Sequence, residues 1–105
     1  MSLIKIHEPN CVGRQRLTVT NAAVVTLTLP NLASPPDEAL FRVANAAIAV
    51  TVDGTNPVND GSVGDVMNAP GHFRVTTAKD LAAFKCIGQS ATNSAVEVTY
   101  FKFEV

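Results

Sequence analysis

The sequence predicts an all-β protein, and three observations lead to this fold class. Apolar and polar residues alternate with a period of two in several segments, as in strands that bury one face. Valine and threonine, which are β-branched and favour strands, recur in these segments. Turns that contain glycine, proline or asparagine separate them at short intervals. We therefore expect an antiparallel β-sandwich, jelly-roll-like, with eight to nine short strands.

The size and composition of the chain predict one domain, residues 1–105. The chain is 47% hydrophobic, and a domain of this length buries about two-thirds of its unfolded surface. Its apolar stretches fall far short of the roughly 20 residues that span a bilayer. The N-terminus lacks the basic start and unbroken apolar block of a signal peptide. We expect synthesis in the cytoplasm and no membrane partner.

Two alternating segments, residues 16–20 and 24–29, predict the first strands. The turn at residues 20–23 predicts that they form a hairpin, and Pro30 ends the second strand because it lacks an N–H donor. The residues expected to face inward are Leu17, Val19, Val25, Leu27 and Leu29.

Residues 36–46 carry two conflicting patterns. Ser34, followed by Pro35-Pro36-Asp37-Glu38, has the capping residue, proline and acids of a helix start. The same run continues without a breaker into residues 47–53, where Ile48, Val50 and Val52 share one face. We favour a strand from about residue 39, and helix is the alternative.

The rest of the chain predicts further short elements. Residues 53–64 are rich in turn formers and predict a loop, and Thr77 with Asp80 predicts a capped helical turn over residues 78–83. The remaining predicted strands are residues 72–77, 84–88 and 95–105.

The last strand has apolar residues of both parities. Val96, Val98 and Tyr100 share one face, whereas Phe101 and Phe103 fall on the other. A strand with one buried face does not accommodate both sets. The alternatives are a bulge near Tyr100–Phe101, a second face covered by another subunit, or a frayed end.

The residues that carry chemistry are few, and their spacing predicts no catalytic residue, metal or cofactor. His72 has outward parity, and Gly61-Ser62-Val63-Gly64 lacks the spacing of a nucleophile elbow. Cys11 and Cys86 are far apart without a nearby histidine, so we expect free thiols rather than a zinc site, with a disulfide as the alternative. We expect the protein not to be an enzyme.

Charge restricts the partners further. The formal net charge is −1, and the eight basic residues are scattered along the sequence, so we expect no nucleic-acid binding. Asp53, Asp60 and Asp65 invite a calcium interpretation, but their spacing does not fit an EF-hand loop and favours turn residues. Charged residues make up only 16%, which indicates that another chain covers part of the surface.

An ordered set of motifs resembles a pattern in small virion-associated proteins of tailed bacteriophages. A small-residue strand from Ala44 runs into Asp53-Gly54-Thr55-Asn56-Pro57. Later parts of the pattern are Gly64-Asp65-Val66-Met67, Ala69-Pro70-Gly71, Asp80-Leu81-Ala82-Ala83-Phe84-Lys85-Cys86-Ile87 and Val96-Glu97-Val98-Thr99-Tyr100. The resemblance covers about residues 39–100. It implies a jelly-roll-like β domain in the virion, without catalytic residues.

The leading hypothesis is therefore a virion structural protein, a head decoration or cement subunit that binds and stabilises the capsid. A neck, tail or fibre component is the alternative within the virion. A carbohydrate-binding β-sandwich is the alternative from another class, and the absence of Trp with a single Tyr counts against it. Expected partners are further copies, as a dimer or trimer, and the major capsid protein or another virion protein. The predicted interface residues are Leu3, Ile4, Ile6, Ala44, Ala47, Ala49, Tyr100, Phe101 and Phe103.

Overall fold

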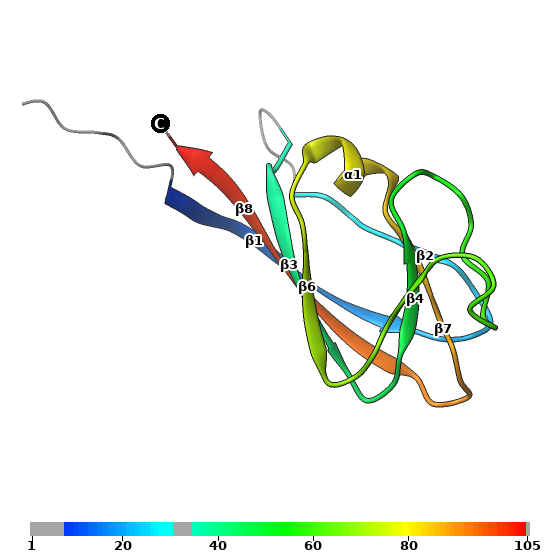
Figure 1. The fold of residues 1–105 in the computed structure, drawn as a ribbon. Helices are drawn as coiled ribbons and strands as arrows, with labels where there is room; N and C mark the ends of the chain where they lie inside the picture. Colours follow the sequence, from blue (N-terminus) through cyan, green and yellow to red (C-terminus); the bar gives the residue numbers. More distant parts are fainter. Residues whose placement is uncertain (1–7, 31–34, 105) are drawn as a thin grey trace, which may run out of the picture.

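The computed structural model describes residues 8–30 and 35–104, and within these ranges it has two four-stranded antiparallel sheets and one short helix (Figure 1). The long sheet has the order β1 (Glu8–Val19), β8 (Ser94–Glu104), β3 (Glu38–Ala44) and β6 (Gly71–Val75). The short sheet has the order β2 (Val25–Thr26), β7 (Lys85–Gly88), β4 (Ile48–Thr51) and β5 (Asp65–Met67). The predicted β-sandwich is confirmed, with eight strands in the described residues.

The alternating pattern correctly identified the core. Leu17 and Val19 of β1 are buried, whereas Arg16 and Thr18 between and beside them are exposed. A stack of three phenylalanines fills the space between the sheets: the ring centroid of Phe41 lies 4.7 Å from that of Phe73 and 4.6 Å from that of Phe84. Stacked aromatic rings stabilise the fold by more than the burial of their apolar surface alone.

The hairpin predicted over residues 16–29 is wrong. β1 pairs with β8 along its whole length, and β2 pairs with β7 in the other sheet. Residues 20–23 therefore cross from one sheet to the other, because a turn signal marks a change of direction but not the partner. The inward positions of the second segment were nevertheless correct, since Val25, Leu27 and Leu29 pack against the core.

The strand favoured over the helix in residues 36–46 is confirmed as β3, but the uninterrupted run into residue 48 is wrong. Asn45 has a φ of 76°, and the turn there sends β3 into the long sheet and β4 into the short one. Asparagine tolerates this left-handed conformation better than most residues. Ile48 and Val50 are buried as predicted, whereas Val52 lies beyond β4 and is 38% exposed.

The predicted loop and helical turn are both present. Residues 53–64 form no strand, and β5, which follows them, was not anticipated. The helix α1 spans Ala78–Ala83, and the Oγ1 atom of Thr77 accepts a hydrogen bond from the amide of Asp80 at 3.1 Å. This cap supplies a partner to one of the free amides of the first turn.

The two apolar parities at the C-terminus belong to opposite faces of β8, which keeps its alternation, and a β-bulge lies beside them in β1. The register of β1 and β8 shifts between Cys11, which is opposite Phe101, and Gly13, which is opposite Tyr100. The bulge thus lies at the predicted place but on the partner strand, with Val12 as the extra residue. Tyr100 is buried, and Phe101 alternates to the outer face of the long sheet, half-buried. The two strand ends continue past the body of the sandwich (Figure 1).

Candidate interaction face

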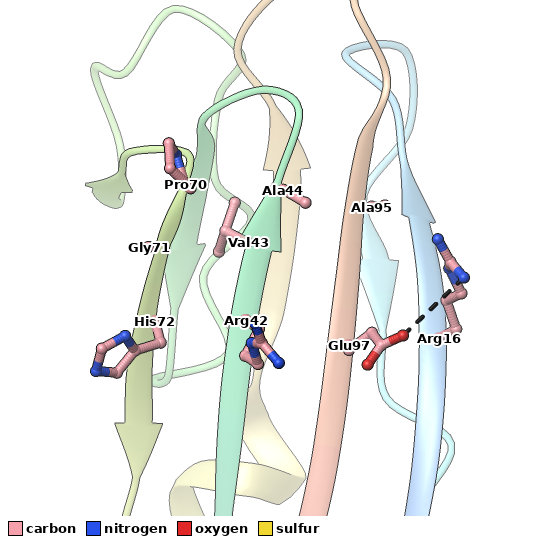
Figure 2. A pocket seen from close by; sticks show the side chains of 9 residues that line it. All are labelled: Arg16, Arg42, Val43, Ala44, Pro70, Gly71, His72, Ala95 and Glu97. Carbon is pink, nitrogen blue, oxygen red and sulfur yellow. Dashed lines mark ion pairs between the residues drawn. The ribbon is translucent and has the colours of Figure 1, made fainter.

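The outer face of the long sheet carries a row of charged side chains that crosses all four strands. Arg16 of β1 is paired in register with Glu97 of β8, which is paired on its other side with Arg42 of β3. Arg42 is in turn paired with His72 of β6. Figure 2 shows these side chains side by side on the sheet. Directly opposite residues on one sheet face are close neighbours, so the row places two arginines, a glutamate and a histidine side by side.

The neighbouring row brings the other two arginines to the same face. Arg14 is paired with Thr99, Thr99 with Leu40, and Leu40 with Arg74. All four arginines of the sequence thus lie on this outer face, which we call the arginine face. The basic residues are scattered along the sequence, but the strand order gathers the four arginines in space.

The acids on the arginine face offset only part of its charge. Glu97 lies 3.6 Å from Arg14 and 4.0 Å from Arg16, measured between side-chain nitrogen and oxygen. Glu38, only 7% exposed, lies 3.2 Å from Arg74. Arg42 forms no ion pair with any residue in the two described ranges. Four guanidinium groups against two carboxylates leave an excess of two positive charges.

A shallow groove of about 460 Å³ lies on this face, at the end where β3 finishes and β6 and β8 begin. Its floor is the Arg16–Glu97–Arg42–His72 row, and Pro70 borders it beyond β6 (Figure 2). The side chains of Arg14 and Arg16 are 71% and 72% exposed, so their guanidinium groups are available to a partner. The groove is open to solvent. Each guanidinium group carries five N–H donors in one rigid plane, a geometry suited to carboxylates or phosphates.

The end of the face near the bulge is apolar. Leu40, Phe101 and Phe103 are half-buried there, and Cys11 beside Phe101 is exposed. Aromatic and arginine side chains on one surface are typical of protein–protein interfaces, where both are enriched.

The predicted interface residues do not form one surface. Ala44 is exposed on the arginine face, and Ala47 is half-buried in the turn that follows β3. The assignment of Ala49 and Tyr100 to the interface is wrong, because they are 0% and 1% exposed: Tyr100 belongs to the core between the sheets, and Ala49 lies on the other face of β4, covered by the loop at Gly64. Leu3, Ile4 and Ile6 lie outside the described residues. Of the predicted set, Ala44, Phe101 and Phe103 remain on the face.

Two of the three aspartates serve the backbone, as the turn interpretation predicted, whereas Asp65 begins the strand β5. Oδ1 of Asp53 accepts from the amide of Thr55 at 3.0 Å, and Oδ1 of Asp60 accepts from the amide of Ser62 at 2.9 Å. The hydrogen bonds from Thr55 and Ser62 hold the pKa of these two carboxyls below the usual value. Within the described ranges, no group of three or more His, Cys, Asp or Glu side chains could hold a metal ion.

The remaining reactive groups are set apart from one another. His72 is exposed, as its parity predicted. The two cysteines are free thiols, as expected, with Cys11 exposed and Cys86 buried. Burial raises the pKa of the Cys86 thiol to about 12. The only tyrosine is buried in the core, so it is not a surface on which a sugar could stack.

The arginine face is not predicted by local sequence patterns, although part of its signal is present in them. Arg16, Arg42 and Arg74 each occupy an outward position in an alternating strand. Only the order β1-β8-β3-β6 makes these positions neighbours, and local patterning does not encode strand order.

Comparison with protein-family models, curated proteins and solved structures finds no match to this chain. None of the described residues belongs to a helix long and apolar enough to cross a membrane.

Proposed function

We propose that this protein is a non-enzymatic structural subunit of a tailed-phage virion, a decoration subunit that binds the head. The observation that carries the proposal is the arginine face, an open sheet surface on which four arginines and two half-buried phenylalanines gather. This composition suits attachment to another protein, and the low share of charged residues, 16%, fits a chain that works in contact with others.

The resemblance to phage virion proteins supports the same conclusion through the fold. Its motif Asp53-Gly54-Thr55-Asn56-Pro57 builds the loop after β4, and Pro57 is buried. Its motif from Asp80 to Ile87 builds most of α1 and β7, where Leu81 and Phe84 enter the core. Motif residues with these roles maintain the sandwich, so proteins that share them are expected to share the fold.

The sandwich presents its two faces differently, which suits a decoration role. The inner face of the long sheet is covered by the short sheet, whereas the outer face remains open to a shell (Figure 1). The ends of β1 and β8 project past the body of the sandwich (Figure 1), and Phe101 and Phe103 of β8 form one end of the arginine face. A subunit that lies on a capsid needs a broad, open surface of this kind rather than a deep pocket.

The test is to locate the chain in purified particles. Particles are produced from a strain that carries the gene and from a matched strain in which it is deleted. Mass spectrometry should find the chain in the first set at many copies per particle, and cryo-electron microscopy should show head-surface density that the deletion particles lack. Absence of the chain from purified infectious particles would contradict the proposal. Density at the neck, tail or fibres would replace the head assignment.

A further inference from the structure

We propose that copies of this chain associate head to tail, with the acidic loop of one copy (residues 53–65) seated on the arginine face of the next. This inference goes beyond the virion proposal and does not depend on it, because it concerns the purified protein alone. It follows from how charge is divided between the two layers of the sandwich.

The arginine face supplies the receiving surface. It has an excess of two positive charges, and Arg42 at its centre has no acidic partner in the described ranges. Glu97 is shared between Arg14 and Arg16 at 3.6 and 4.0 Å, so neither guanidinium is fully satisfied. Arginine stays protonated at any physiological pH, and its planar guanidinium group can donate two parallel hydrogen bonds to a carboxylate.

The acidic loop supplies the complementary charge. Residues 43–73 contain no lysine or arginine, and Asp53, Asp60 and Asp65 in this stretch are all exposed. Asp53 and Asp60 use only Oδ1 to accept backbone amides, which leaves Oδ2 free to accept from a guanidinium. The nearby Lys85 donates to Oδ1 of Asn56 at 2.9 Å rather than to one of these carboxylates.

The fold keeps these opposite charges apart within one chain. The loop connects β4 and β5 of the short sheet, whereas the arginines lie on the far side of the long sheet (Figure 1). A second copy can supply the loop from outside, and the groove of about 460 Å³ that Arg16 and Arg42 line has room for several side chains of a loop. A contact between two different surfaces is heterologous, so it repeats into a ring or an open chain.

The arginine face favours a protein carboxylate over a nucleic acid. Proteins that bind single strands interleave their cations with aromatic side chains on which bases stack. Beside the arginine row, the described aromatic side chains are the imidazole of His72 and, at the far end, two half-buried phenylalanines. The acidic loop, by contrast, provides charge of the right sign on the same molecule.

The test uses two complementary variants. The face variant carries Arg16→Glu and Arg42→Glu and keeps its acidic loop. The loop variant carries Asp53→Asn, Asp60→Asn and Asp65→Asn and keeps its arginine face; asparagine retains the Oδ1 acceptor of the two turns. Lys79→Glu, on the exposed surface of α1, is the matched charge-reversal control. Circular dichroism verifies that each variant is folded.

Native mass spectrometry and sedimentation velocity at micromolar concentration then give the outcome. The wild type and Lys79→Glu should form oligomers that dissociate as salt rises from about 0.01 to about 1 M, because the Debye length falls from about 30 to about 3 Å. Each complementary variant alone should be a monomer, and their mixture should form a 1:1 heterodimer that grows no further. Only a contact between the loop of one copy and the arginine face of another predicts that two monomeric variants associate when they are mixed.

Several results would overturn the inference. A monomeric wild type at low salt, variants that still associate alone, or a mixture that stays monomeric would each do so. Arginine-dependent binding of a fluorescent oligonucleotide by a monomeric wild type would assign the face to nucleic acid instead. The virion proposal is judged separately: a wild type that is monomeric yet abundant on particles contradicts only the head-to-tail contact.

Discussion

The hydroxyl of Tyr100 donates a hydrogen bond to Oε1 of Gln15 at 2.8 Å, across the pair β1–β8. The same oxygen accepts from the amide of Thr28 at 3.1 Å. Gln15 occupies an inward position of β1, two residues before Leu17, where an apolar residue would be expected. Its side chain gives the hydroxyl of a tyrosine that is 1% exposed its partner, and it ties β1, β8 and the segment after β2 together.

Removal of either partner should destabilise the protein, but by different amounts. Tyr100→Phe removes one hydrogen bond and leaves Gln15 bonded to Thr28, so the free energy of unfolding should fall by about 1 kcal/mol. Gln15→Ala leaves both the Tyr100 hydroxyl and the Thr28 amide without this acceptor, and should cost about 2 to 3 kcal/mol. Urea unfolding measures both. An equal cost for the two variants would contradict the shared-acceptor role.

The single tyrosine should also report on alkaline stability. Burial raises the pKa of Tyr100 from 10.0 to about 12, because the phenolate is disfavoured inside the protein. The group is protonated in both states below pH 10, so its contribution is fully present there and is lost as the pH rises toward about 12. Ultraviolet titration should show one transition well above pH 10, and Tyr100→Phe should flatten the decline of stability in this window. Ionisation near pH 10 in the folded protein would contradict the burial.

The elements that sequence patterning predicted well are those fixed by neighbouring residues. Alternation placed Leu17, Val19 and Val96 in the core because a strand turns successive side chains to opposite faces. Thr77 predicted its helical turn because the capping bond spans only three residues. The hairpin prediction failed because pairing depends on distant segments, here on the C-terminal strand.

The candidate site was harder to predict for the same reason. Arg16 and Arg42 are 26 positions apart in sequence, and both approach Glu97 only because β8 is inserted between their strands. Tyr100 was assigned to an interface because its parity conflicts with that of Phe101. In the fold β8 keeps its alternation, so Tyr100 lies in the core and Phe101 on the half-buried outer face, and the strand's own sequence does not show which parity faces the core.

The two cysteines should differ sharply in reactivity. Cys11 is exposed, whereas Cys86 is 0% exposed and its pKa is about 12. Since the thiolate is the reactive form, Ellman's reagent at pH 8 should label one thiol per folded chain and two in denaturant. Cys11→Ser should abolish labelling of the folded protein while preserving one thiol in denaturant. Rapid labelling of two thiols in the native protein would show that the strand β7 opens readily.

Two glycines of the acidic loop offer a matched test of how closely it packs on β4. Both have left-handed backbone conformations, with φ of +84° at Gly54 and +107° at Gly64. An added Cβ at Gly54 meets nothing within 4 Å, whereas at Gly64 it would lie 3.0 Å from the carbonyl oxygen of Val50 and 3.3 Å from Cβ of Pro57. Gly54→Ala should therefore destabilise the fold only because alanine disfavours a positive φ. Gly64→Ala should destabilise it for the same reason and also because the new methyl group would crowd Val50 and Pro57.

We expect Gly54→Ala to lower the free energy of unfolding by about 1 to 2 kcal/mol, the cost of a left-handed L-residue. Gly64→Ala should cost at least about 1 kcal/mol more, because the carbonyl of Val50 belongs to the ladder of β4 and its shift strains pairing with β5 and β7. Urea unfolding measures the difference: if the dependence of the unfolding free energy on urea concentration is the same for both variants, the difference in midpoints gives the difference in stability. If the two variants unfold at the same midpoint, the loop does not close on β4 at Gly64. Its aspartates would then be held less firmly than a contact with the arginine face of a second copy requires.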